Sequence, residues 1–165
     1  MTSAAAATAA PQAGEDFRVA LVCMPFNLAI RPSIQIGLLQ AIAQKAGFAT
    51  DAYYLNLDLA QRIGPEFYEA LAKYHRHSLC DWLFSAAAFG ESSTPSDEEY
   101  LAAFPGVLAW TAQAGIDADG LLQIRHRLIP AYIEHCLTTV DWGAYAVVGF
   151  SSTFQQNVAC LALAR

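Results

Sequence analysis

Hydroxyl side chains cluster in residues 149–156, where Ser151, Ser152 and Thr153 follow Gly149 and a short apolar run. The run is typical of a buried strand, and the apolar spacing after the hydroxyls is typical of a helix. Gly149 allows a ligand or a neighbouring backbone to come close. Hydroxyls at such a junction can cap the helix, whose first amides attract anions. The segment therefore predicts either a cofactor or anion site, or only a capped helix without a ligand.

A second group of candidates follows the first apolar run, residues 18–24, which Pro25 ends. Pro32 and Ser33 then open a helix, because proline is tolerated in the first turn. Arg31 is the one charge near the carboxyl end of this strand, which is the edge where open parallel sheets bind ligands. It predicts a contact with an anionic or amide-rich ligand, or an ordinary ion pair with a carboxylate.

Other catalytic and metal-binding patterns lack residues that they need. Residues 149–153 differ from the G-x-S-x-G nucleophile elbow at the fifth position, and neither an acid nor a histidine follows them. The four cysteines are far apart, so neither a zinc ribbon nor a cluster site is expected. The histidines are interpreted as surface residues, and the dinucleotide and P-loop fingerprints are absent. We assign no catalytic and no metal-ligating residue.

The amino-acid composition and net charge exclude some classes of binding partner. The chain has 165 residues, is 55% hydrophobic and carries a net charge of −6, which indicates one acidic domain with a real core. Its nine scattered Lys and Arg residues make no basic face, so nucleic acid is not expected. No apolar run approaches the roughly 20 residues of a membrane span. Residues 1–16 are interpreted as a disordered tail, and widely spaced cysteines suit a reducing, cytoplasmic location.

The elements around these candidates form a strand–helix–strand unit. Residues 18–24 are apolar after Arg18, which predicts a central parallel strand buried on both faces. Apolar residues then recur at helical spacing at Ile34, Leu38 and Ile42, and Gly47 is placed to end that helix. Residues 49–55 are typical of a second strand, and the crossover should be right-handed.

Residues 57–141 have a different pattern, which predicts several helices inserted before a third strand at residues 145–150. The expected breaks are Gly64-Pro65, Pro105-Gly106 and Pro130. The fold class is thus α/β, with a Rossmann-like open parallel sheet of few strands and a large helical insertion between strands 2 and 3. Such an insertion is expected to cover a ligand or a partner domain. Because the sequence stops within a helix, we expect a fragment of a longer or split protein.

Several stretches together resemble the N-terminal region of the radical SAM C-methyltransferases that mature ribosomally made peptides. The resemblance runs over residues 17–165, and it depends on the order and spacing of the motifs rather than on any single one. The motifs are Val22-Cys-Met-Pro-Phe26, Arg31-Pro-Ser33 with Gly37-Leu-Leu39, Tyr54-Leu-Asn56, Asp81-Trp-Leu-Phe84 with Phe89-Gly90, and residues 148–157.

The resemblance implies a cobalamin-binding domain ahead of a radical SAM barrel. The barrel's CxxxCxxC motif is absent, so the 4Fe–4S cluster and S-adenosylmethionine would belong to a domain outside this sequence. No histidine precedes His75 and no DxHxxG motif occurs, which implies cobalamin without a histidine ligand on its lower face. The expected cofactor-binding residues are Met24, Pro25, Phe26, Arg31, Pro32, Ser33, Asn56, Gly149, Ser151, Ser152, Thr153, Gln155 and Gln156.

The expected partners are the radical SAM barrel, in the same chain or a separate one, and the precursor peptide. The alternative hypothesis is a non-catalytic interaction domain without a cofactor. In that case the sheet would pack on the barrel, and the helical insertion would bind the precursor peptide. Retention of cobalamin separates the two hypotheses.

Overall fold

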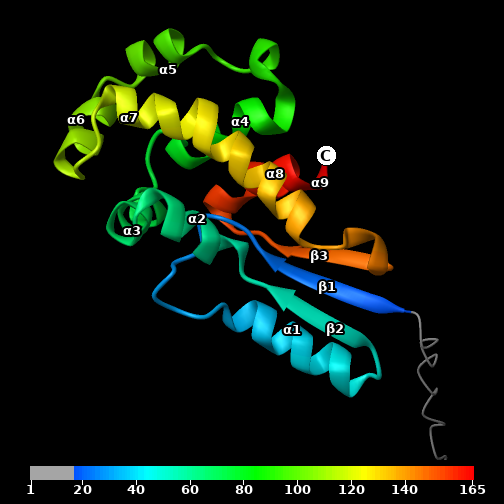
Figure 1. The fold of residues 1–165 in the computed structure, drawn as a ribbon. Helices are drawn as coiled ribbons and strands as arrows, with labels where there is room; N and C mark the ends of the chain where they lie inside the picture. Colours follow the sequence, from blue (N-terminus) through cyan, green and yellow to red (C-terminus); the bar gives the residue numbers. More distant parts are fainter. Residues whose placement is uncertain (1–16) are drawn as a thin grey trace, which may run out of the picture.

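Three parallel strands form the centre of the protein, whose computed structural model describes residues 17–165 (Figure 1). The strands are β1 (Arg18–Cys23), β2 (Ala49–Tyr53) and β3 (Val147–Ser151), in the order β2-β1-β3. Leu21 is opposite Ala52 on one side and Gly149 on the other. The predicted α/β fold with a Rossmann-like open parallel sheet is confirmed. The predicted tail, residues 1–16, lies outside the described residues.

The central position of β1 follows from its composition. Ala20, Leu21, Val22 and Cys23 are all buried, as expected for a strand that is covered on both faces. The two outer strands are less buried, because each has a partner on one side only. Within the described residues, no helix is both long and apolar enough to cross a bilayer.

Helix α1 (Ile34–Lys45) connects β1 to β2, and it begins after Ser33, so Pro32 precedes the helix and is not in its first turn. The Ser33 hydroxyl accepts a hydrogen bond from the Ile36 amide at 3.3 Å, which caps the first turn. Gly47 has a φ of +89° and follows the helix as the left-handed residue of a Schellman motif. The cap predicted at this glycine is confirmed.

The apolar stripe of α1 does not face the sheet, although its helical spacing is typical of a core-facing surface. Ile36 is the buried residue of the helix, while Ile34 is 81% exposed and Leu38 is 59% exposed. On the sheet side, the Gln40 and Gln44 side chains donate to the Thr50 carbonyl oxygen at 3.1 and 3.3 Å. The helix therefore turns two glutamines towards β2 and leaves its most apolar surface to solvent.

The chain between β2 and β3 is helical, as predicted, and two of its breaks occur where the sequence indicates them. Gly64, with a φ of +90°, separates α2 from α3, and Pro105 precedes α6. The third break is a π-helical turn, η2, which lies ahead of Pro130 rather than at it. From β2 to β3 the elements are α2 (Leu55–Ile63), α3 (Pro65–Lys73), α4 (Leu79–Phe89), η1 (Glu91–Ser93), α5 (Asp97–Ala103), α6 (Gly106–Gln113), α7 (Ala118–Gln123), η2 (Ile124–Leu128), α8 (Ile129–Thr139) and η3 (Trp142–Ala144). After β3 the chain continues with η4 (Phe154–Gln156) and α9 (Asn157–Ala164).

Two clusters of buried residues lie on opposite faces of the sheet. The larger cluster joins the insertion and α9 to one face of β1, and it includes Val22, Tyr68, Phe84 and Tyr132. The smaller cluster, Leu21, Cys23 and Ile36, lies under α1. Figure 1 shows this arrangement, with α1 on one side of the sheet and α8 and α9 on the other. The insertion therefore covers the chain's own core.

Candidate functional site

The carboxyl ends of β1 and β3 lie side by side, which brings together the two segments predicted to bind a ligand. Cys23 is opposite Ser151 in the parallel ladder. Beyond the strands, the Gln156 side-chain amide donates to the Met24 carbonyl oxygen at 2.5 Å. We call residues 24–33 and 149–156 together the strand-end shelf.

Part of the shelf is core rather than surface. Met24 is fully buried, and Pro25 and Phe26 are buried beside it. The Phe26 ring stacks on Tyr68 with the ring centroids 5.6 Å apart, and the Tyr68 hydroxyl donates to the Asn27 carbonyl oxygen at 2.6 Å. Met24, Pro25 and Phe26 are thus buried, Phe26 against α3 and α4, so a ligand on the surface of this structure does not touch them.

The rest of the first loop is held against α3. Glu69 accepts hydrogen bonds from the Ala29 and Ile30 amides at 2.6 and 3.2 Å. Arg31 and Pro32 are exposed next to this anchor. Arg31 forms no ion pair with any residue in the described part of the chain. Its guanidinium thus remains a surface charge at the start of α1.

Asn56 lies in the first turn of α2, because β2 ends at Tyr53, earlier than the predicted strand. Its side chain is 1% exposed, and its Nδ2 donates to the Asn27 carbonyl oxygen at 3.4 Å. Its Oδ1 is buried without a hydrogen-bond partner among the described residues. Asn56 therefore holds the backbone of the first loop from within the protein and is not a surface contact.

Gly149 has a packing role in this structure. A Cβ atom there would lie 3.4 Å from the Leu21 Cδ2 atom, so the glycine gives room to the side chain of the neighbouring strand. Ser151, the last residue of β3, is half-buried, and its carbonyl oxygen accepts a weak hydrogen bond from the Cys160 thiol at 3.9 Å. The close approach that the sequence predicts at Gly149 is thus an approach by Leu21.

The turn after β3 is capped by its own side chains. Thr153 and Gln156 form a capping box around η4, in which the Thr153 amide donates to the Gln156 Oε1 atom at 3.2 Å. The exposed Ser152 hydroxyl donates to the Asn157 Oδ1 atom at 2.5 Å. The predicted capping role is confirmed for Thr153. The accessible polar groups of this turn are Ser152, Thr153 and the half-buried Gln155.

A pocket of about 550 Å³ opens beside this turn. Its lining combines the turn with the start of α4, and the residues are His75, Ser78, Asp81, Gln155 and Asn157. We call it the Asp81 pocket. Of these five residues only Gln155 was predicted as a site residue. A carboxylate at the start of an otherwise apolar helix, Leu79–Phe89, was the available signal for Asp81.

Gln155 and Asp81 each contribute a buried oxygen to the pocket. The Gln155 Nε2 atom donates to the Tyr74 carbonyl oxygen at 2.6 Å and lies 3.0 Å from the His75 Nδ1 atom. The Gln155 Oε1 and Asp81 Oδ1 atoms have no hydrogen-bond partner among the described residues. Burial raises the pKa of the Asp81 carboxyl, and an interaction with the Val158 amide partly opposes this.

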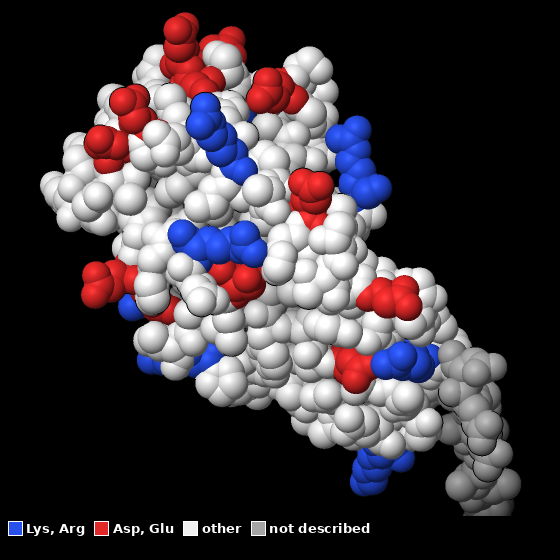
Figure 2. Space-filling view, in the orientation of Figure 1, with Lys and Arg blue, Asp and Glu red and all other residues white. Residues whose placement is uncertain are grey.

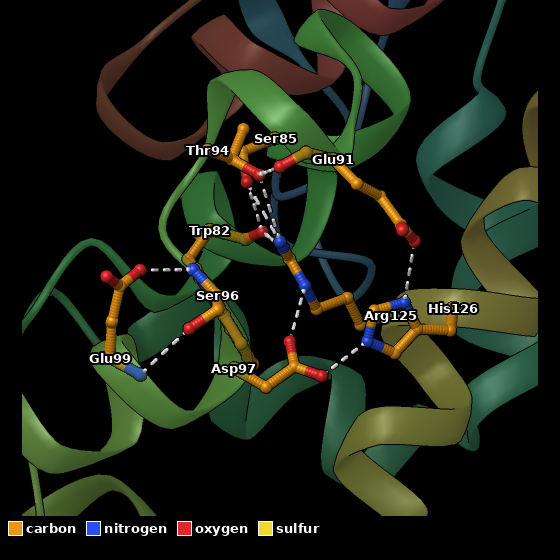
Figure 3. A network of polar contacts seen from close by, with 9 residues as sticks. All are labelled: Trp82, Ser85, Glu91, Thr94, Ser96, Asp97, Glu99, Arg125 and His126. Atoms are coloured by element: carbon orange, nitrogen blue, oxygen red, sulfur yellow. Dashed lines mark hydrogen bonds and ion pairs between the residues drawn. The ribbon is translucent and has the colours of Figure 1, made fainter.

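A second polar cluster lies inside the insertion, around Arg125 (Figure 3). The Arg125 side chain is 2% exposed, and its Nε donates to the Asp97 Oδ1 atom at 3.1 Å. Its Nη1 donates to the Trp82 carbonyl oxygen and, at 3.1 Å, to the Ser85 hydroxyl. Its guanidinium lies 4.3 Å from the centroid of the Trp82 ring. The His126 Nε2 atom is 2.6 Å from the Asp97 Oδ2 atom.

This cluster is built to hold the insertion together. Arg125 lies in the π-helical turn η2 and reaches across to α4, while Nη2 contacts the Thr94 hydroxyl at 3.5 Å. Ser96 and Glu99 form a capping box at the start of α5, beside Asp97. Since each guanidinium nitrogen already has a protein acceptor, the cluster offers no set of donors to an anion.

Metal chemistry finds no support in the part of the chain that the structure describes. No group of three or more His, Cys, Asp or Glu side chains there is arranged to hold a metal ion. The four cysteines are all buried, and burial raises the pKa of each thiol, to about 11 for Cys136. Figure 2 shows acidic side chains gathered over the α5–α7 end of the visible face, and basic side chains placed singly.

The fold and the polar edge of the sheet define an α/β protein with a Rossmann-like open sheet. No protein-family model, no curated protein and no solved structure matches this chain. The functional assignment therefore depends on the residues and the geometry.

Proposed function

We propose that this chain is the cobalamin-binding domain of a B12-dependent radical SAM methyltransferase, a cytoplasmic enzyme that acts on a ribosomally made peptide. The observation that carries the proposal is the strand-end shelf, where the loops after β1 and β3 meet at the carboxyl edge of a parallel sheet. Open α/β sheets bind their ligands at this edge. The sequence resemblance covers the same two loops.

The polar groups of the shelf that a ligand could reach lie on its β3–α9 side. Ser152 and Thr153 are exposed, so their hydroxyl groups would face a ligand above the β3–α9 turn, whereas the Gln155 Nε2 atom is held by Tyr74 and His75. Cobalamin bears amides and a phosphate-linked nucleotide tail, which such groups can hydrogen-bond. Because Met24 and Phe26 are buried, the ring would rest on the β3–α9 side, with Arg31 at its margin.

Histidine chemistry also favours cobalamin without a protein ligand on cobalt. His75 is the histidine that lies beside the shelf, and its Nδ1 is 3.0 Å from the Gln155 amide nitrogen. The Tyr74 carbonyl fixes the orientation of that amide, so Nδ1 accepts the hydrogen bond. In the neutral ring the hydrogen is then on Nε2, so neither ring nitrogen keeps a free lone pair for a metal.

When bound, cobalamin would supply the methyl group that is transferred to a carbon of the peptide. The cluster and S-adenosylmethionine would be held by the barrel, in the same chain or a separate one. In this division of labour Ser152 and Thr153 bind and orient the corrin amides. Glu69 and Tyr68 hold the backbone of the first loop, which supports the shelf.

The test is retention of hydroxocobalamin through desalting, followed by the corrin absorbance. We expect the folded protein to keep the absorbance and Ser152→Trp to weaken retention at least tenfold, since the indole would occupy the surface above the turn. Ser92→Trp is the matched control, because Ser92 is an exposed serine on η1 in the insertion. A folded but colourless protein would contradict the proposal.

The second candidate is an interaction domain without a cofactor, and the exposed stripe of α1 favours it. Ile34, Leu38 and Ile42 are 81%, 59% and 56% exposed, which is unusual for three large apolar residues on one helix face. Such a face would pack on the radical SAM barrel, while the insertion binds the precursor peptide. A colourless protein that binds the barrel, and whose binding is lost in Leu38→Asp, would support this function over the first.

A further inference from the structure

The Asp81 pocket presents acceptors that the protein itself does not satisfy. The Gln155 amide is oriented by two contacts of its nitrogen, with the Tyr74 carbonyl oxygen at 2.6 Å and the His75 Nδ1 atom at 3.0 Å. This orientation leaves its Oε1 atom on the other side, buried and without a donor among the described residues. A flipped amide would place an oxygen against two acceptors, so the assignment follows from the network.

Asp81 adds a second acceptor of the same kind. It lies in the first turn of α4, and its Oδ1 atom is buried without a donor among the described residues. No lysine or arginine in the described part of the chain pairs with it, and Arg76, in the neighbouring loop, is exposed. Asp81 is half-buried, and a carboxylate oxygen that is shielded from water is normally paired with a cation or a hydrogen-bond donor. The described residues therefore supply the Asp81 carboxylate with no cation.

The other polar groups of the pocket do not have the same need. His75 and Ser78 are exposed, so water can satisfy their N–H and O–H groups. The buried groups that need a partner are both oxygens, and one of them belongs to a carboxyl group. A planar cation with parallel N–H groups matches two such oxygens better than a neutral amide, because it adds charge attraction to the hydrogen bonds.

We propose that the Asp81 pocket binds an amidinium or guanidinium group, which donates N–H hydrogens to the Asp81 and Gln155 side-chain oxygens. The natural source would be a guanidinium compound or an arginine side chain of a peptide. This site is adjacent to the strand-end shelf but does not depend on a cofactor. Binding at this site can therefore be tested independently of cobalamin binding.

Three probes of similar shape test the proposal on the full chain: benzamidine, benzamide and acetophenone. The first is a cation with paired N–H groups, the second is a neutral amide, and the third has no N–H group. Binding is followed in ¹H–¹⁵N spectra through the side-chain amide signals of Gln155 and Asn157. We expect saturable shifts with benzamidine, at least tenfold weaker binding of benzamide and none of acetophenone.

Two variants separate the pocket from general surface charge. Asp81→Asn keeps the shape and removes the charge, so benzamidine affinity should fall at least tenfold. Asp119→Asn, an exposed carboxylate on α7, should leave the affinity unchanged. Displacement of benzamidine by agmatine or by the peptide acetyl-Gly-Arg-Gly-amide supports the proposal, and the stronger competitor identifies the source.

Three results would overturn it. Benzamide binding as tightly as benzamidine would make the pocket an amide site, unchanged affinity in Asp81→Asn would place the cation elsewhere, and absent shifts would mean that no such site exists. A protein that binds benzamidine but not hydroxocobalamin would refute the proposed function alone.

Discussion

The two faces of the sheet are covered by helices of very different character (Figure 1). On the insertion face, large side chains such as Tyr68, Phe84 and Tyr132 are fully buried in one continuous core. On the α1 face, Ile36 is the buried residue of the helix, and Ile34 and Leu38 are exposed. One face thus has a complete core of its own, while the other leaves its apolar surface uncovered.

The insertion and α1 also differ in their charged residues. The insertion buries Arg125 in a network with Asp97, whereas Lys45 is the one charged residue of α1. Burial lowers the pKa of Arg125 and the Asp97 carboxylate opposes this effect. The insertion is thus held by interactions that would be costly to break, while α1 is attached by few.

Removal of the buried cation should be the most damaging change. Arg125→Met keeps much of the volume but removes the buried guanidinium that pairs with Asp97 and donates to the Trp82 carbonyl oxygen, so we expect a loss of about 3 to 5 kcal/mol in the free energy of unfolding. Urea unfolding followed by circular dichroism measures it. The control is Arg62→Met, which breaks an exposed pair with Asp58 and should lose at most about 1 kcal/mol. Equal losses in the two variants would remove the contrast.

The buried and exposed isoleucines of α1 sharpen the comparison within one helix. Ile36→Ala should lower the free energy of unfolding by about 2 to 4 kcal/mol, because it opens a cavity in the smaller core cluster. Ile42→Ala, at a residue that is 56% exposed, should change it by about 0.5 kcal/mol or less. Urea titrations of both variants give the answer. A larger loss for Ile42 would mean that α1 packs on the sheet through its other face.

The capping box at the start of α5 should have an intermediate effect. Ser96→Ala removes the hydroxyl that accepts from the Glu99 amide, so we expect a loss of about 1 kcal/mol. Ser92→Ala serves as the control, because the Ser92 side chain caps no helix in the described structure. Thermal unfolding followed by circular dichroism distinguishes the two. Indistinguishable midpoints would show that the box adds no stability.

The smallest effect on stability is expected at the outer face of α1. Leu38→Gln should change the free energy of unfolding by about 0.5 kcal/mol or less, because the side chain is 59% exposed. The same change should reduce binding of the dye ANS, which reports exposed apolar surface. Gln35→Asn, on the exposed side of the same helix, is the control for both measurements. A clear loss of stability in Leu38→Gln would show that this leucine is part of the core.

Local patterns predicted much of the fold, because local chemistry decides those features. The apolar run of β1, the cap at Gly47 and the breaks at Gly64 and Pro105 all depend on residues near to one another in sequence. The orientation of α1 could not be predicted in this way. The hydrophobic pattern indicated one face, but the contacts of Gln40 with β2 place the opposite one against the sheet.

The candidate site also has features that local chemistry decides and features that tertiary packing decides. The capping role of Thr153 was readable from its neighbours, whereas the burial of Met24 and Phe26 depends on helices that follow much later in the chain. Asp81 and Gln155 meet in one pocket although a long helical segment separates them in sequence. No periodicity or short motif reports such a meeting, because it is a product of tertiary packing.

The pairing of β1 with β3 has a consequence for the order in which the protein is made. β1 leaves the ribosome first among the strands, but its neighbour β3 is synthesised only after the whole insertion. Until then one edge of β1 has exposed main-chain groups and can pair with another nascent chain. Slow translation or a bound chaperone during this interval should therefore determine the yield of native protein more than the stability of the finished fold.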